Sequence, residues 1–241
     1  MAGYWNTKYY SQPTKAELEQ KAKKSTATAK RKGVIYDPVI LEGRTICKSW
    51  WGIAWCENLE RYADYASRID RGKRYVRNGS VIDLQIGRGK VTARVQGTRR
   101  TPYKVEIRIS PLSEEKCQSI MERAGKKLDS LEALLSGSFP EEMKDLFFEE
   151  GGLFPTPAEI SLLCSCPDWA LMCKHVAAVL YGIGARFDRD PLLFFELRGL
   201  DVNKFIDTTL QNRVDEMLEH AENRTSRMID SEDLSSIFGV L

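Results

Sequence analysis

The sequence has no uninterrupted run of eighteen apolar residues, so no membrane-spanning helix is expected. Its N-terminus, MAGYWNTKYYSQPTK, also lacks the apolar core of a secretory signal peptide. We therefore predict a cytoplasmic protein that makes no contact with membranes. Cysteines stay reduced in the cytoplasm, which favours metal binding over disulfide bonds.

A second absence is the phosphate-binding loop of P-loop ATPases, G-x-x-x-x-G-K-[ST]. The segment Gly87-Arg88-Gly89-Lys90 contains glycines and a lysine, but it predicts only a basic hairpin turn. No helix is rich in arginine, asparagine and glutamine, which are the residues that recognise base edges. The chain is therefore predicted to be neither such an ATPase nor a strongly sequence-specific DNA-binding protein.

Cysteine and histidine are scarce, with six and two residues in a chain of 241. Four of these eight nevertheless fall within one short window, as C-x-C, six residues, and C-x-H. Three thiolates and one imidazole at this density are the ligand set of a closed, four-coordinate zinc site. Because four protein ligands leave no open position, the zinc is expected to be structural. The predicted ligands are Cys164, Cys166, Cys173 and His175.

The spacing of these residues also predicts the local fold of the site. Cys164 and Cys166 would point to the same face of a strand, and Pro167 would then turn the chain. Cys173 and His175 would point about 200° apart in the middle of a helix, so they can share a metal only at its start. We therefore predict a strand-turn-helix zinc finger, and loss of one ligand should unfold it.

Two other interpretations of the quartet remain. The cysteines and the histidine could simply be buried, but the charged Lys174 between Cys173 and His175 fits poorly with a continuous core. A cysteine paired with the histidine could instead be the nucleophile of a thiol-dependent enzyme, which would leave two cysteines without a role. The isolated Cys47, Cys56 and Cys117 are predicted to be packing residues.

The net charge is only +2, but the charges are unevenly distributed. Residues 61–108 contain thirteen Lys or Arg and four Asp or Glu, whereas residues 109–163 contain five and eleven. Residues 186–241 are acidic as well, with seven Lys or Arg and twelve Asp or Glu. A local basic surface attracts polyanions through counterion release, although a solvated surface of mixed charge is the alternative interpretation.

Three segments of alternating polarity lie in the basic region, at Ser80–Ile86, Lys90–Gln96 and Tyr103–Ile109. They predict a three-stranded antiparallel meander with one buried face. The other face would carry Lys90, Arg94, Gln96, Lys104 and Arg108, together with Asp83 and Glu106. The predicted phosphate contacts on and beside this meander are Arg74, Arg77, Arg88, Lys90, Arg94, Arg99, Arg100 and Lys104.

The remaining patterns are helical. Trp51, Trp55, Leu59 and Tyr62 form one apolar stripe, which predicts a core-facing helix from which Trp50 would project. A short strand at Ala158–Leu163 leads into the quartet. The predicted fold class is therefore α+β, with a zinc finger packed on C-terminal helices. Further helices are predicted at Ser113–Lys127, Ser130–Leu135, Glu141–Phe148, Lys174–Phe187, Pro191–Leu197 and Val202–Ala221.

The pattern from Cys164 to His175 matches the SWIM zinc finger, C-x-C-x(n)-C-x-H. Upstream stretches resemble the prokaryotic SWIM-finger proteins that are associated with Snf-type helicases, and the resemblance covers roughly residues 34–200. The matching stretches are SWWGIAW at 49–55, GKRYVRNG at 72–79, VTARVQG at 91–97 and PYKV at 102–105. The resemblance implies the same four zinc ligands, and a role in DNA binding or protein interaction beside a helicase-like ATPase.

These observations favour a non-enzymatic, zinc-binding adaptor that contacts nucleic acid, DNA rather than RNA, and works with a Snf-type helicase or ATPase on another polypeptide. One alternative is a protein-interaction module that docks this ATPase without touching nucleic acid. The other is a thiol-dependent enzyme with Cys173 or Cys166 as its nucleophile.

Four segments are predicted along the chain. Residues 1–45 would form a basic, partly disordered arm, and residues 46–150 an α+β domain with the basic meander. Residues 151–200 would form the SWIM-type zinc finger, and residues 201–241 an acidic C-terminal helix and tail.

Overall fold

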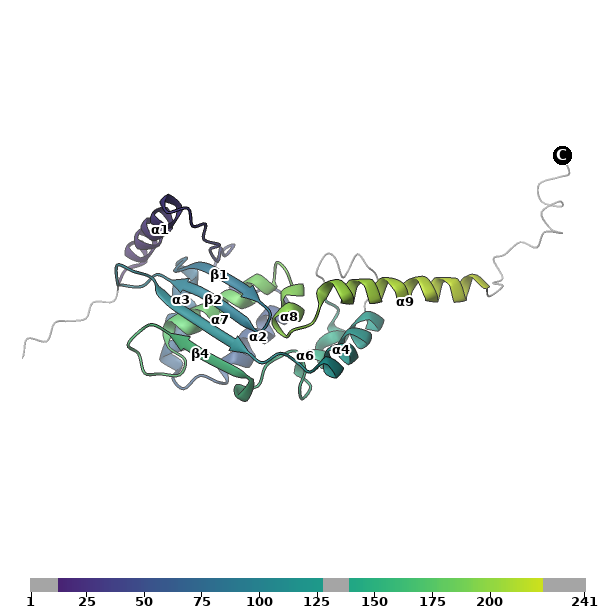
Figure 1. Ribbon diagram of the computed structural model, residues 1–241. Helices are drawn as coiled ribbons and strands as arrows, with labels where there is room; N and C mark the ends of the chain where they lie inside the picture. The colour runs from purple at the N-terminus through teal and green to yellow at the C-terminus, as the bar shows by residue number, and fades with distance from the viewer. Residues whose placement is uncertain (1–12, 128–138, 223–241) are drawn as a thin grey trace, which may run out of the picture.

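The computed structural model describes residues 13–127 and 139–222, and it confirms the α+β class. Its single sheet is antiparallel, with four strands in the order β1-β2-β3-β4 (Figure 1). The three predicted strands are present within one residue at each end, and the predicted strand before the quartet joins them as the fourth. The strands are β1 (Val81–Gly87), β2 (Lys90–Val95), β3 (Tyr103–Ile109) and β4 (Ile160–Cys164).

The pairing of β4 with β3 attaches the cysteine segment to the meander. Val105 is opposite Cys164 and Ile109 is opposite Ile160. On β3, Val105, Ile107 and Ile109 face the core, while Lys104 and Arg108 are exposed on the other side. The predicted finger and the predicted meander therefore share one sheet and one hydrophobic core.

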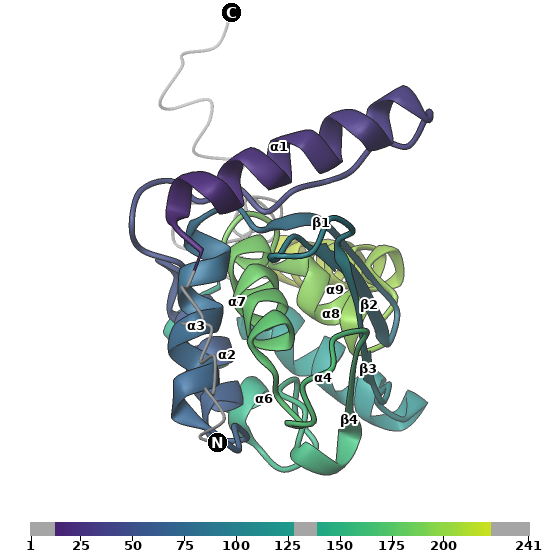
Figure 2. The ribbon, with the colours of Figure 1, turned by 90° about the vertical axis from the view of Figure 1, so that its left-hand side faces the viewer.

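Helix α7 (Lys174–Phe187) is the centre of the fold. Figure 2 shows it between the sheet and a second helical layer made of α2 (Trp50–Glu60) and α3 (Ala66–Arg77). Almost all of α7 is buried, as its continuous apolar sequence predicts. The approach of α3 is so close that a Cβ atom at Gly72 would lie 2.5 Å from the Cβ of Ala177. Glycine is therefore required at this helix crossing.

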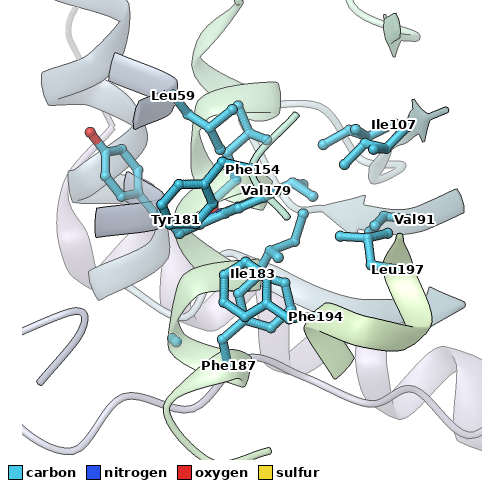
Figure 3. Packing of buried hydrophobic residues seen from close by; sticks show 14 of the residues in the cluster. Leu59, Val91, Ile107, Phe154, Val179, Tyr181, Ile183, Phe187, Phe194 and Leu197 are labelled. Carbon is cyan, nitrogen blue, oxygen red and sulfur yellow. The ribbon is translucent and has the colours of Figure 1, made fainter. Parts of the chain in front are cut away.

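Aromatic side chains surround the C-terminal end of α7. Phe187 and Phe194 are stacked with ring centroids 3.6 Å apart, and Figure 3 shows them beside Ile183. Trp55 is fully buried and donates its indole N–H to the carbonyl of Leu180, so the predicted core stripe is confirmed. Trp50 was expected to project, but it is half-buried and donates to the Phe139 carbonyl.

Further helical elements lie toward this aromatic end, which is at the right of Figure 1. They confirm the predicted helices around residues 113–127, 141–148, 191–197 and 202–221, while the helix predicted at Ser130–Leu135 lies outside the described residues. Within the described part of the chain, no helix is long and apolar enough to cross a bilayer. The elements are α4 (Glu114–Lys127), η1 (Glu141–Met143), α6 (Lys144–Phe148), η2 (Pro157–Glu159), α8 (Leu192–Leu197) and α9 (Val202–Glu222).

Helix α1 (Lys15–Arg31) lies at the opposite end of the sheet. It begins with a capping box, in which the Thr14 side chain and the Glu17 carboxylate each accept a backbone N–H. Its Leu18 is buried, and the Ser25 hydroxyl donates to Gln96 at 2.6 Å. Gln96 was expected on the exposed face of the meander. It is buried instead, because β2 ends at Val95 and the alternation of faces ends with it.

Candidate metal centre

The four predicted ligands meet where β4 ends and α7 begins. Cys164 is the last residue of β4, and Cys166 follows in the turn. Cys173 is the N-cap residue of α7, and His175 lies in the first turn of that helix. This is the predicted strand-turn-helix arrangement.

The donor atoms of these four residues all lie within 4.8 Å of one another. The Nδ1 atom of His175 is 3.9 Å from the sulfur of Cys164 and 4.0 Å from that of Cys173. Neighbouring ligand atoms of a tetrahedral zinc ion are about 3.5–3.8 Å apart, given the usual zinc–ligand bond lengths. The four residues could therefore hold a metal ion, and they are the only such group of three or more within residues 13–127 and 139–222.

Burial and hydrogen bonds set the protonation of the donors. Hydrogen bonding from Cys164, joined by His175 and the Val176 amide, lowers the pKa of Cys173 to about 4 against the opposing effect of burial. The hydrogen bond to Cys173, together with burial, raises the pKa of Cys164. Burial also lowers the pKa of His175. A thiolate and a neutral imidazole are the forms in which these side chains bind metals.

Neighbouring aromatic rings fix the orientation of His175, which is only 1% exposed. Tyr103 stacks on the imidazole at 4.0 Å, and Tyr75 meets it edge-on at 5.5 Å. The Nε2 atom is buried and has no hydrogen-bond partner within the described residues. A Cβ atom at Gly97 would lie 3.3 Å from Nε2 and 2.7 Å from the Tyr103 ring. The β2–β3 loop thus packs directly on the back of the proposed ligand.

Two side chains from the segment around α3 hold the loop between Cys166 and Cys173. The Asp64 carboxylate accepts the backbone N–H groups of Leu171 and Met172, at 2.9 and 3.3 Å. Arg68 forms an ion pair with Asp168 at 3.1 Å. Asp64, Arg68 and Asp168 were not among the predicted site residues. Asp64 and Arg68 precede their partners by 100 residues or more, so no local spacing could have revealed them.

The eight predicted phosphate contacts lie in separate places. Lys90, Arg94 and Lys104 share the outer face of the sheet. Arg99 and Arg100 are exposed on the β2–β3 loop, and Arg100 lines a cleft beside α1. The other three lie apart from this face, with Arg74 and Arg77 in the last turn of α3 and Arg88 on the turn between β1 and β2.

Acidic side chains partly neutralise the cations of the outer face. Arg94 lies 3.6 Å from Asp83, and Lys90 lies 3.0 Å from Glu106. Arg108 is 2.7 Å from the same glutamate. The hydrogen bonds from Lys90 and Arg108 hold the pKa of Glu106 below its usual value, so this carboxylate stays charged at neutral pH. The net positive charge of the face is therefore smaller than the number of cations suggests.

The fold and the site define an α+β protein in which a Cys₃His cluster capable of holding a metal joins the last strand to the central helix. The chain is 35% identical over 193 residues to the uncharacterized protein Rv2102 of Mycobacterium tuberculosis, and the match covers 78% of this chain and 69% of that protein. The chain belongs to the same family as Rv2102. No protein-family model and no solved structure matches it.

Proposed function

We propose that the Cys₃His cluster binds zinc, and that the protein is a non-enzymatic adaptor that contacts DNA and works with a Snf-type helicase or ATPase. One observation carries the proposal: the donors come from three thiols and one imidazole and complete a four-coordinate sphere. A closed sphere gives a zinc ion a structural role, because no position is left for water or substrate.

The donor chemistry favours zinc over other metals. Soft thiolates combined with an imidazole suit zinc, whereas calcium and magnesium require oxygen ligands. Cys173 lies at the N-terminus of α7, whose helix dipole favours negative charge there. Metal analysis of the purified protein should give one zinc ion per chain, and Cys173→Ser should remove most of it. A full metal load in this variant would contradict the proposed ligand set.

Contact with nucleic acid is supported by the location and charge of the open surfaces. The outer face of the sheet is turned toward the viewer in Figure 1, and no described helix crosses it. Lys90, Lys104 and Arg108 are exposed on this face. The resemblance to SWIM-finger proteins adds the helicase-like partner to the proposal.

The test of this function is a binding titration with DNA over a range of salt concentrations. Binding should be detectable at low salt, and log K should fall steeply and linearly with log salt, as counterion release requires. A pull-down from native lysate, with and without nuclease, then tests the ATPase partner. Absence of DNA binding at low salt would contradict the nucleic-acid part of the proposal.

A second candidate function is protein interaction alone, and one surface favours it. On the loop of the metal centre, Trp169 is 81% exposed and Leu171 is 77% exposed, with the Tyr65 ring edge-on to Trp169 at 5.7 Å. Exposed aromatic side chains are common anchors of protein interfaces. Under this alternative, capture of a partner from lysate should persist after nuclease treatment. The Trp169→Ser variant should no longer capture that partner.

A thiol-dependent enzyme is the third possibility raised by the sequence. It requires a free, reactive Cys173 or Cys166. If zinc holds these residues, thiol labelling of the native protein should spare them until a chelator is added. Rapid labelling of Cys166 in the zinc-loaded protein would favour the enzyme.

A further inference from the structure

Helix α1 and the loop between β2 and β3 enclose an open cleft of about 860 Å³, which we call the α1 cleft. Figure 2 shows α1 across the top of the view, above α3, α7 and β1. One wall is a face of α1, and the other wall is the loop that packs on His175. The charged and aromatic side chains that line the cleft are Lys21, Lys24, Arg31, Lys32, Arg100 and Tyr36.

The charges of the α1 cleft are not neutralised. Five of its lining residues are lysine or arginine, and none of the described lining residues is aspartate or glutamate. Lys24, Lys32 and Arg100 have no carboxylate within ion-pair distance anywhere in the described part of the chain. On the outer sheet face, in contrast, Lys90, Arg94 and Arg108 lie beside carboxylates, and Lys104 alone of its cations forms no ion pair within the described residues. A polyanion gains more from uncompensated cations, because it does not have to displace a bound carboxylate.

The shape of the cleft fits an unpaired strand. The stretch that lines it runs from Lys21 in α1 to the C-cap residue Lys32 and is about 16 Å long at the usual helical rise. The volume lies in the range of ligand clefts and has room for a few unpaired nucleotides. Tyr36 supplies a half-buried aromatic ring at the cleft, and Ile35 beside it is 89% exposed. Single-strand grooves combine a cationic track with such rings, on which bases stack.

We propose that the α1 cleft binds single-stranded nucleic acid. This inference rests on the proposed nucleic-acid function. It places the main binding site in the cleft, whose lining includes only Arg100 of the eight predicted phosphate contacts. The two walls are tied together by Gln96, which accepts a hydrogen bond from Ser25 and donates to the carbonyls of Gly97 and Arg99. Because Gly97 also packs on His175, the metal centre supports the loop that forms one wall of the cleft.

The experiment uses the full, zinc-loaded chain and a short fluorescent oligothymidine, with fluorescence polarisation as the readout. The cleft variant is K24Q/K32Q/R100Q, and the sheet-face variant K90Q/K104Q/R108Q should weaken binding less than the cleft variant does. The matched control is K48Q/K116Q/K204Q, which removes the same charge from exposed lysines outside both surfaces. Loss of three phosphate contacts should weaken binding about 100-fold at about 0.1 M salt and reduce the salt slope by about 2. The control should change affinity less than about 5-fold, although its net charge is the same.

Tyr36 tests the contribution of the aromatic ring, whose face also lies 5.3 Å from the Arg94 guanidinium of the sheet face. Tyr36→Ala should weaken binding by about 10-fold, whereas Tyr36→Phe keeps the ring and should bind like the wild type. A hairpin duplex of the same base composition and a poly-glutamate peptide serve as competitors. Both should compete at least 10-fold less well than the unlabelled single strand. Zinc content and melting temperature of every variant confirm that the fold is intact.

If the wild type binds neither single strand nor duplex at low salt, the proposed function fails together with this inference. If the wild type binds but the sheet-face variant is weakened and the cleft variant is not, only the α1 cleft is overturned. Equal competition by the duplex would overturn the preference for single strands. Equal competition by poly-glutamate would overturn nucleic acid as the ligand of the cleft.

Discussion

The two ends of α7 are held in place by different kinds of chemistry. At the N-terminal end, Cys173 and His175 belong to a cluster of polar donors that can hold a metal ion. At the C-terminal end, Phe187 packs among aromatic rings that include Trp55 and Phe194. We therefore expect the first end to be stable only when its donors are satisfied, whereas the other depends mainly on the burial of aromatic rings.

The stability of the two ends should therefore depend differently on metal supply and redox state. Each large aromatic side chain buries about 150–250 Å², and this contribution does not depend on redox state or metal supply. The metal end instead buries the Cys173 thiol and the imidazole of His175, whose Nδ1 atom faces the sulfur atoms of Cys164 and Cys173. Buried donors without partners oppose folding, so a bound ion should be what makes this end rigid.

The largest effect is expected from removing the metal. Chelation or Cys173→Ser should abolish hydrogen-exchange protection in residues 164–176 and in the β2–β3 loop, because zinc contributes about 10–16 kcal/mol to the folding of small zinc domains. Residues 187–197 should stay protected. The matched control is Cys117→Ser, which changes a buried cysteine of α4 outside the cluster. Uniform loss of protection along the whole of α7 would contradict the distinction between its two ends.

The aromatic end should show the opposite behaviour. Trp55→Ala removes a fully buried side chain and its hydrogen bond to Leu180, so unfolding should become easier by about 3–5 kcal/mol. The melting temperature should fall by roughly 10 °C or more, while zinc content at low temperature stays unchanged. Trp169→Ala is the control, since removing this exposed side chain should lower the stability only slightly. If Trp55→Ala lost its zinc at low temperature, the two ends would not be separable.

The sequence predicted those features that depend on neighbouring residues. The four ligands span twelve positions, so their spacing alone indicated a strand, a turn and a helix start. The apolar stripe from Trp51 to Leu59 and the alternation in β3 also depend only on neighbouring residues, so they could be predicted. Gln96 was placed on the wrong side, because alternation predicts a face only while the strand continues. The polar contacts that support the site could not be predicted, because Asp64 meets Leu171 across 107 positions.

Local sequence patterns also could not predict which surface charges are neutralised. A run of lysines and arginines shows where cations are concentrated, but not which of them are neutralised by partners from another strand. Arg94 and Asp83 are paired in the register of β1 and β2, which follows from the two-residue turn at Arg88 and Gly89. In contrast, the docking of α1 through Leu18 and Ser25 has no local signal, and the α1 cleft becomes visible only in the fold. The division of the chain into four segments stays a prediction.

A smaller effect is expected from a buried ion pair at the aromatic end. Arg198 is 1% exposed and donates to Glu159 at 2.7 Å and to the Ser110 carbonyl. Arg198→Met leaves these acceptors without their donor and should cost about 3 kcal/mol in urea unfolding. Arg123→Met is the control, because its pair with Glu149 is much more exposed and should contribute less than about 1 kcal/mol.

The pair also predicts a dependence on pH. Burial acts to raise the pKa of Glu159, but hydrogen bonds from Thr156 and Arg198 hold it below the usual 4.5. A lowered carboxylate pKa stabilises the fold above 4.5, and this stabilisation is lost as the pH falls through the lower, folded-state value. The melting temperature should therefore decline below about pH 4.5, and less steeply in Arg198→Met. Equal slopes in the two proteins would argue against this pair as a source of acid sensitivity.

The smallest effect is expected from Asp64, which sharpens the comparison at the metal end. Asp64→Ala removes two hydrogen bonds to the loop and should cost about 1 kcal/mol of stability. Zinc should nevertheless dissociate about 10-fold faster, since residues behind the ligands tune metal affinity. Stopped-flow transfer of zinc to a chromogenic chelator measures this rate. An unchanged rate, with the loss of stability present, would limit Asp64 to a packing role.

The position of the quartet in the chain has a consequence for the order of folding. The ligands lie within twelve residues, but β4, which carries the first of them, pairs with a strand that ended about fifty residues earlier. Closing the short ligand loop loses less chain entropy than closing the long connection between β3 and β4. Metal capture should therefore precede the closure of the sheet during synthesis, so that the last strand reaches β3 with its turn and helix start already formed.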